Sequence, residues 1–429
     1  MPIQKKQVSV NDLEFGVFIA ELDRPWTDTP FLFQGFVLNN EKDLETLKKY
    51  CKKVVIDLEK GSDLPDRSQL QAGPITGGER AKSMPGRKAG QVTSADYAKS
   101  VLATIKKRVV YEEKATVDAE LPAARAARTK TQSVLKDMFN TLQAGNALDA
   151  PRIKEAVTSM TDSVVRNPDA MLLLAKLKQQ SAHTLDRALG VSIYMITFGR
   201  FLQLPREQLD LLGMVGLLQD VGKTRVPEEV LNKKEPLSNV DLALCRSHVE
   251  HSAAILTETP GLPPELPELA ALHHERYDGS GYHKGLKGEE IGLFGSIAGM
   301  VDCFDALTHP RPYGEALAPS NALNMLYGWR GSQFDGPLVE QLIQCIGIFP
   351  VGAIVELNSG EIGIVIAQNL VRRLQPRVMV VLDAKGNPKK PPLILDLSRE
   401  PKMNAETPYR IKRTLEKGSV AIDPAEFFL

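Results

Sequence analysis

Apolar residues alternate over short stretches near the N-terminus and recur at helical spacing through most of the remaining chain. The first stretches predict strands at residues 8–10, 17–20 and 31–38. A helix over 41–52, with Leu44, Leu47 and Tyr50 at helical spacing, and a strand at 54–57 follow them. This pattern predicts a small α/β or β-rich domain over residues 1–62.

The rest of the pattern divides into four segments. Residues 63–94 are rich in Gly, Pro, Ser and charge and predict a flexible linker. Residues 95–164 have helical periodicity and predict a helical connector. Residues 165–347 stay helical after a start signal at Asn167-Pro168, and only a glycine-rich loop at 278–281 interrupts them. Short β-type runs separated by turns then predict a small β appendage and tail over 348–429.

Composition narrows the function classes. The 429 residues include 53 basic and 53 acidic side chains, and this zero net charge argues against a dedicated DNA-binding protein. Four scattered cysteines without a CxxC pair favour a reducing cytoplasm. The N-terminus lacks the apolar run of a signal peptide, and no apolar stretch reaches membrane-spanning length. We therefore expect a cytoplasmic protein with no membrane span.

The histidines point to metal chemistry. All seven lie between His183 and His309, within the predicted all-α domain. Imidazoles and carboxylates are distributed over its predicted helices, at His183, Asp220, His248, His273, His274 and Asp302. Such groups on several helices of one bundle can converge on a metal, and a His/Asp set without thiolates suits iron, manganese or zinc better than calcium. Two such ions can clamp a phosphoryl group and activate water.

This ordered series resembles an HD-GYP domain, a branch of the HD metal-dependent phosphohydrolases that cleaves cyclic di-GMP. The resemblance includes the segments 220–223, 273–282, 285–286, 305–307 and 311–313. It implies an all-α HD-type bundle over 165–347, with the N-terminal α/β or β-rich domain and the β appendage as separate parts of a multidomain chain. Residues 1–140 also resemble an uncharacterised domain commonly fused to HD-GYP modules.

The resemblance assigns roles to individual residues. It implies a site of two or three iron- or manganese-type ions and hydrolysis of cyclic di-GMP to pGpG or GMP. Asp220 and Lys223 are the predicted catalytic residues, and the substrate contacts are Lys223, Arg311, Tyr282, Arg276 and Lys284. The predicted metal ligands are His183, Asp220, His248, His273, His274 and Asp302. Asp278 is expected to shape the glycine-rich loop and Asp305 to support the helix of Asp302, whereas the remaining histidines, His251, His283 and His309, are expected at the surface.

Four positions depart from the family pattern. Gln219 stands where the family has the histidine of its His-Asp pair, and Gln179 stands where competent members often carry a glutamate ligand. His283 replaces the proline of the GYP signature, and Gly314 replaces a basic residue that grips phosphate. A neutral amide is a poor ligand beside an imidazole. We expect two divalent ions if the site is competent, and one or none if it is degenerate.

Two functions therefore stay open. The first is a metal-dependent cyclic di-GMP phosphodiesterase with reduced or lost activity. The second is a catalytically inactive cyclic di-GMP receptor or protein-interaction scaffold. Diguanylate cyclases or other signalling proteins are candidate partners in either case, and a homodimer is possible.

Overall fold

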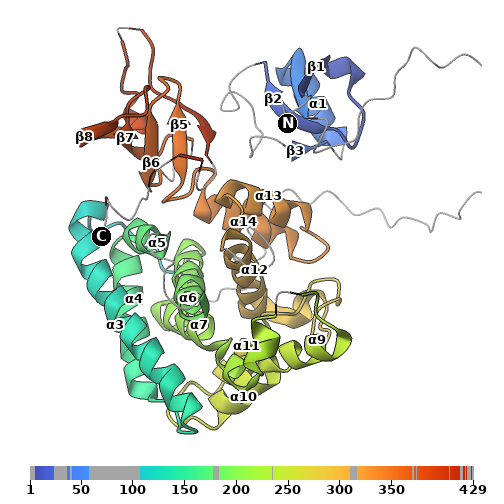
Figure 1. The fold of residues 1–429 in the computed structure, drawn as a ribbon, viewed down its shortest axis with the longest axis vertical. Coiled ribbons are helices and arrows are strands. Elements are labelled where there is room, and N and C mark those ends of the chain that lie inside the picture. The colour runs from blue at the N-terminus through green and yellow to red at the C-terminus, as the bar shows by residue number, and fades with distance from the viewer. Residues whose placement is uncertain are drawn as a thin grey trace, which may run out of the picture. The chain divides into compact units, whose positions relative to one another are not determined.

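The computed structural model describes residues 5–23, 36–38, 41–57, 107–176, 183–233, 235–309, 316–369, 372, 374–404, 406–415, 419–420, 422 and 427. The chain divides into two compact units, residues 1–97 and 98–429, and each is described by itself (Figure 1). The predicted linker at 63–94 lies outside the described residues. The domain boundaries inferred from the sequence stay predictions.

The described part of the first unit is a sheet covered by a helix. Antiparallel strands are paired in the order β1-β4-β2-β3. The elements are β1 (Lys5–Ser9), β2 (Phe18–Leu22), β3 (Phe36–Val37), α1 (Glu41–Tyr50) and β4 (Lys53–Asp57), with a short 3-10 helix, η1 (Val10–Asp12). Ile19, Leu47 and Ile56 are fully buried in its core. The predicted α/β domain is confirmed; of the predicted strand at 31–38, residues 31–35 lie outside the described part.

Helices dominate the second unit, as the sequence predicts. They are α3 (Val117–Gln143), α4 (Ala150–Arg166), α5 (Pro168–Lys176), α6 (His183–Phe201), α7 (Arg206–Leu218), α8 (Glu228–Leu231), α9 (Asn239–Arg246), α10 (His248–Thr257), α11 (Leu266–Ala270), α12 (Gly292–Thr308), α13 (Pro319–Gly328) and α14 (Gly336–Ile346). Short 3-10 helices, η4 (Val221–Arg225) and η5 (Gly288–Ile291), lie between them. In Figure 1, α3 and α4 flank α6 and α7, which in turn contact α12.

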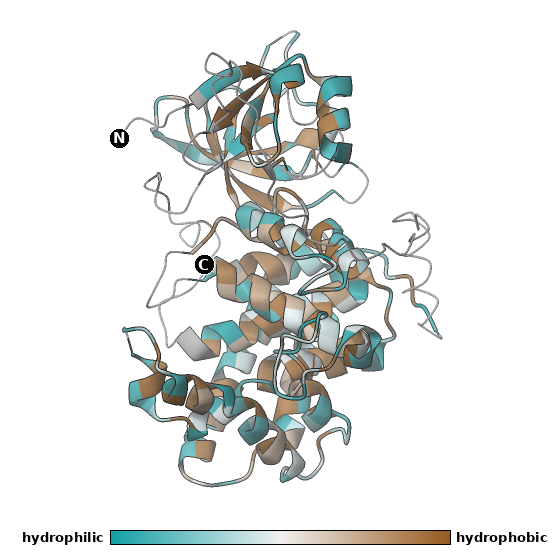
Figure 2. Cartoon of the chain, turned by 90° about the vertical axis from the view of Figure 1, so that its right-hand side faces the viewer, coloured by the Kyte–Doolittle hydropathy of each residue, from teal (hydrophilic) through white to brown (hydrophobic). Residues whose placement is uncertain are grey.

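The close crossing of α6 and α7 fixes the position of the functional region. A side chain at Gly216 would place its Cβ 2.7 Å from the Cα of Ser192, so the two helices approach at backbone distance. The Ser192 hydroxyl donates a hydrogen bond to the Gly213 carbonyl (2.8 Å). Hydrophobic residues, in brown, recur along the helices in Figure 2. Residues 188–200 of α6 and 212–218 of α7 are all buried. The C-terminal end of α7 is thereby held against the core.

A second antiparallel sheet follows the helices and confirms the predicted β appendage. Its strands are paired in the order β8-β7-β6-β5-β9. Their bounds are β5 (Ile354–Leu357), β6 (Ile362–Ala367), β7 (Arg377–Leu382), β8 (Pro388–Asp396) and β9 (Ile411–Thr414), with a short 3-10 helix, η6 (Leu397–Arg399), after β8. Val355, Val365 and Val378 are fully buried in its core.

Hydrogen bonds join this sheet to the helical part. The Gln368 side-chain amide donates to the carbonyls of Ile346 (3.2 Å) and Phe349 (2.6 Å), and its backbone N–H donates to Asp169 Oδ2 (2.9 Å). Asp169 lies in the first turn of α5, where the Asn167 side chain caps the helix as predicted. Burial raises the pKa of the Asp169 carboxyl to about 7, although the Gln368 hydrogen bond opposes that rise.

Within the described residues, one helical stretch is long and apolar enough to cross a membrane by length and composition. It covers Gly288–Thr308, and 61% of its most apolar window is buried inside the protein. A core helix passes the same test, and α12 packs against α6, α7, α11 and α13. This stretch is therefore weak evidence for a membrane span.

The buried Asp169 predicts a pH-dependent stability. Between its unfolded pKa near 3.8 and its folded pKa of about 7, the folded state keeps a proton that the unfolded state has lost, so stability falls as pH rises through this window. Asp169→Asn removes this titration. We expect its effect on the free energy of unfolding, relative to the wild type, to be more favourable at pH 8 than at pH 4 by up to about 4 kcal/mol. Urea unfolding at several pH values measures this difference. Asp137→Asn, on the exposed surface of α3, is the control, and equal pH profiles for the two variants would contradict the prediction.

Candidate metal centre

A glycine brings the end of α7 against the start of α10. Asp220 follows α7, and Gly222 lies in η4 directly after it. A Cβ at Gly222 would lie 2.1 Å from the His248 carbonyl oxygen and 2.4 Å from the Ser252 nitrogen, so only glycine fits without displacing backbone. The Gly222 N–H donates to the Ser252 hydroxyl (2.8 Å). This approach places the Asp220 carboxylate beside the His248 imidazole.

Backbone carbonyls orient two of the imidazoles. His248 Nδ1 lies 2.5 Å from the Cys245 carbonyl oxygen, and His273 Nδ1 lies 2.7 Å from that of Ala270. A carbonyl oxygen can only accept, so each Nδ1 carries a proton, and Nε2 of the neutral imidazole then presents a lone pair. The two Nε2 atoms lie 3.3 Å apart. This is the arrangement of imidazoles prepared to bind a metal.

Asp220 faces both of these nitrogens. Its Oδ1 lies 3.2 Å from His248 Nε2 and 3.6 Å from His273 Nε2. This oxygen is buried and has no hydrogen bond to any residue that the structure describes. Burial acts to raise the pKa of the Asp220 carboxyl, but the Lys223 ammonium, 2.7 Å from Oδ2, holds it well below its usual range. An ionised oxygen and two nitrogen lone pairs therefore converge on one point, where a cation would relieve their repulsion.

His274 completes the group. Ligand atoms of Asp220, His248, His273 and His274, hereafter the Asp–His cluster, all lie within 4.8 Å of one another. The His274 ring stacks on Tyr282, with centroids 4.6 Å apart and planes 22° apart. Burial, reinforced by neighbouring His273, lowers the pKa of His274 far below its usual value. A neutral imidazole is the form that coordinates a metal, so the Asp–His cluster fits one divalent ion.

Of the two other predicted ligands, Asp302 lies outside this cluster. Its Oδ1 accepts hydrogen bonds from Arg187 Nη2 (2.8 Å) and from Gln219 Nε2 (3.3 Å). Arg187 Nε also contacts Asp305 Oδ2 (3.3 Å). Burial acts to lower the pKa of Arg187, but Asp302 and Asp305 raise it above its usual value. The His183 side chain and all of Gln179 lie outside the described residues, so the structure brings together four of the six predicted ligands and separates Asp302 from them.

The predicted substrate contacts have various partners. Lys223 Nζ binds Asp220 Oδ2 (2.7 Å), and Lys284 Nζ lies 3.8 Å from Glu268. Arg276 donates to the carbonyl of Glu275 (2.8 Å) and lies over the Phe334 ring. Arg311 and Gly314 lie outside the described residues. The roles of these side chains in substrate binding stay predictions.

Sequence reasoning missed three contributors. The buried carboxylate of Glu275 accepts hydrogen bonds from the backbone N–H groups of Lys284 (2.7 Å) and Leu286 (3.0 Å) and so closes the glycine-rich loop. Arg246 lies over the Tyr282 ring, 4.9 Å from its centroid. Arg187 is the third. An acid directly after His273-His274 was a visible signal for Glu275, but nothing in a single sequence pairs Arg187 with a helix more than a hundred residues away.

The histidines outside the cluster differ in their surroundings. The prediction of a surface position is wrong for His309, which is buried at the end of α12. Its Nδ1 contacts the Asp305 carbonyl oxygen (2.8 Å). His283 is exposed, as predicted, and lies 3.6 Å from Glu250. Asp278 accepts a hydrogen bond from the Ser280 backbone (2.8 Å) and so shapes the loop as expected.

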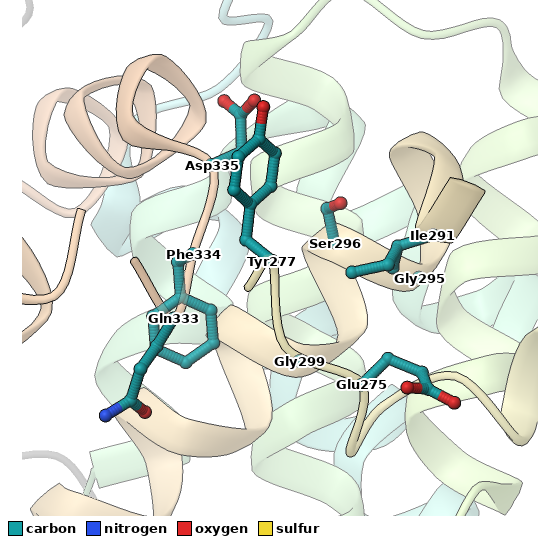
Figure 3. Close-up of a pocket in the computed structure, with 9 residues that line it drawn as sticks. All are labelled: Glu275, Tyr277, Ile291, Gly295, Ser296, Gly299, Gln333, Phe334 and Asp335. Carbon is teal, nitrogen blue, oxygen red and sulfur yellow. The ribbon is translucent and has the colours of Figure 1, made fainter. Parts of the chain in front are cut away.

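A small hollow lies beside the glycine-rich loop (Figure 3). Its lining residues are Glu275, Tyr277, Ile291, Gly295, Ser296, Gly299, Gln333, Phe334 and Asp335. The Tyr277 ring and the Asp335 carboxylate extend in the same direction in this view, and burial, followed by Asp335, raises the pKa of Tyr277. No member of the Asp–His cluster lines this hollow, so the hollow belongs to the packing of the loop.

Three protein-family models match the chain. The first is an HD domain, which matches residues 170–338. A domain of unknown function matches residues 5–153. A KOW domain associated with HD domains matches residues 354–412. The HD match contains every member of the Asp–His cluster.

Several curated proteins match at the sequence level, and three of them follow. A cyclic di-GMP phosphodiesterase of Pseudomonas aeruginosa is 32% identical over 396 residues, which cover 92% of this chain and 89% of the relative. A cyclic di-GMP phosphodiesterase response regulator of Xanthomonas campestris is 38% identical over 33% of this chain and 38% of its own length. A 3'3'-cGAMP-specific phosphodiesterase of Vibrio cholerae is 30% identical over 44% of this chain and 37% of its own. Because the first match spans almost the whole of both proteins, the chain belongs to the HD-GYP family of HD-domain proteins, whose members include that Pseudomonas phosphodiesterase.

Proposed function

We propose that the protein is a metal-dependent cyclic di-GMP phosphodiesterase that hydrolyses its substrate to pGpG or GMP at a reduced rate. The observation that carries the proposal is the Asp–His cluster, in which the Nε2 atoms of His248 and His273 and the Oδ1 atom of Asp220 lie within 3.6 Å of one another. The kinship with the Pseudomonas phosphodiesterase supports the substrate class.

The donor set favours a transition metal. Three imidazoles and one carboxylate suit iron, manganese or zinc, whereas magnesium and calcium prefer oxygen ligands. We propose an ion of the iron or manganese type, held by Asp220, His248, His273 and His274. When bound, such an ion polarises a phosphoryl oxygen and lowers the pKa of water.

The chain's own residues supply the remaining parts. Lys223 keeps a positive charge against Asp220 (2.7 Å), at the edge of the cluster where a substrate phosphate would arrive. Tyr282 offers an aromatic face already stacked on His274. Arg276 and Lys284, on either side of the glycine-rich loop, and Arg311 add positive potential toward an anionic ligand. Each of these roles is part of the proposal.

Gln219 supports the reduced rate. Its amide Nε2 donates to Asp302 (3.3 Å), so the residue acts as a hydrogen-bond donor to a carboxylate. The family histidine at this position would instead offer an imidazole nitrogen. Fewer donors remain for metal binding, and the transition state for phosphoryl transfer depends on positive charge at the reacting centre.

A catalytically inactive cyclic di-GMP receptor or interaction scaffold is the second candidate. The non-ligating residues Gln179, Gln219 and Gly314 favour it, whereas the ordered Asp–His cluster favours the enzyme. A cytoplasmic location, partners such as diguanylate cyclases or other signalling proteins, and a homodimer belong to either proposal.

Metal binding is tested by removing one ligand from α10. We expect His248→Ala to weaken Mn²⁺ binding by more than about 100-fold, because losing a ligand costs more affinity than losing a residue that only hydrogen-bonds to a ligand. His251→Ala removes a histidine from the same helix outside the cluster and is the control, which should bind like the wild type. Isothermal titration of chelator-stripped protein measures both. Equal weakening by the two substitutions would contradict the proposed centre.

Catalysis is tested by incubating the Mn²⁺- or Fe²⁺-loaded protein anaerobically with cyclic di-GMP and, in parallel, with 3'3'-cGAMP. We expect slow formation of pGpG from cyclic di-GMP, abolished by EDTA and by Asp220→Asn, because this substitution removes the charged ligand. Asp210→Asn, on the surface of α7, is the matched control and should keep the wild-type rate. Chromatographic detection of products gives the result.

Three outcomes of this assay contradict the proposal in different ways. Cyclic di-GMP that binds and stays intact on metal-loaded protein would establish the receptor alternative. Turnover confined to 3'3'-cGAMP would overturn the proposed substrate. Product formation that survives Asp220→Asn would overturn the proposed centre.

A further inference from the structure

Arg187 contacts Asp302, a predicted metal ligand outside the Asp–His cluster, where a second of the predicted ions would need this carboxylate. We propose that the Arg187 guanidinium replaces that second metal, so that the protein binds one divalent ion only. This inference rests on the proposed function in one respect, because it takes the Asp–His cluster as the site of the remaining ion. It names the residue that limits the metal count.

The geometry of Arg187 is that of a bridge between two carboxylates. Nη2 contacts Asp302 Oδ1 at 2.8 Å, and Nε contacts Asp305 Oδ2 at 3.3 Å. Both carboxylates extend from α12, one turn apart, and both are buried. Arg187 reaches them from α6, one turn after His183. A guanidinium presents donors in a fixed fork and stays charged, so it pairs with both carboxylates as a cation would.

Gln219 completes the occupation of Asp302. Its Nε2 donates to the same oxygen that Arg187 contacts. Gln219 is itself buried, and its Oε1 has no hydrogen bond to any residue that the structure describes. A metal ion approaching Asp302 Oδ1 would have to displace both donors and leave the partly buried guanidinium without this partner, which is costly.

The local charge leads to the same conclusion. The ion pairs of this region join two cationic side chains to three carboxylates. Arg187 pairs with Asp302 and Asp305, and Lys223 pairs with Asp220. This set alone carries one excess negative charge. One divalent ion reverses that charge, whereas a second would add two more positive charges beside the partly buried Arg187 guanidinium. Uncompensated buried charge is strongly unfavourable.

The inference predicts which substitutions change the metal count. We expect one Mn²⁺ per chain in the wild type and in Gln219→His, because Arg187 still holds Asp302. The double variant R187M/Q219H, which frees Asp302 and restores an imidazole, should bind two. Arg206 also bridges two carboxylates, Asp162 and Asp210, at the start of α7. R206M/Q219H is therefore the matched control and should bind one.

Elemental analysis and isothermal titration of chelator-stripped full-length protein give these counts, and circular dichroism checks the fold of each variant. If R187M/Q219H does not fold, R187M/D305N/Q219H removes one of the unpaired carboxylates and provides the same test. A folded variant lacking Arg187 that still binds one ion would overturn the inference. Two ions in the wild type would overturn it alone, whereas no ion in the wild type would overturn the proposed function as well.

Crystals of the wild-type protein grown with Mn²⁺ give a test that needs no variant. Anomalous scattering should show one ion on the Asp–His cluster, with Arg187 still within hydrogen-bond distance of Asp302. An ion between Asp220 and Asp302, with Arg187 displaced, would overturn the inference.

Discussion

The functional region depends on two imidazole nitrogens and one carboxylate oxygen that face one another at 3.2–3.6 Å. The Cys245 and Ala270 carbonyls direct the protons of His248 and His273 away from the centre, and Lys223 keeps Asp220 ionised. Three electron-rich atoms at these distances repel one another in a buried environment. The surrounding fold must hold them together, and a bound cation converts their repulsion into attraction.

The helical core provides that constraint. Glycines allow backbone contact where α7 crosses α6 and where η4 meets α10, so Asp220 and His248 are held by main-chain packing. Glu275 does the same for the loop after His273-His274, because its carboxylate binds two backbone N–H groups on the far side of that loop. The ligands therefore come from rigid elements, which favours a preformed site.

The sequence predicted the fold classes, and it singled out the four candidate ligands that the structure brings together, because hydrophobic periodicity and the order of histidines and aspartates are local properties of the chain. It did not predict how α6 meets α12. In the sequence, Arg187 is one charged residue on an apolar helix, and nothing there distinguishes it. Only the fold shows that it pairs with Asp302 and Asp305. His309 was misplaced for the same reason, because it is buried against α6, where a Cβ at Gly190 would lie 3.9 Å from its Cε1. The sequence shows the glutamine at position 219, but it does not show that this side chain hydrogen-bonds to Asp302.

A single-ion centre at the Asp–His cluster is the central claim, and electron paramagnetic resonance of the Mn²⁺-saturated wild-type protein tests it most directly. The account predicts the hyperfine pattern of an isolated Mn²⁺ ion, with nitrogen couplings from coordinated imidazoles that disappear in His248→Ala. The spectrum of an exchange-coupled pair of ions, or an isolated ion without nitrogen coupling, would contradict it.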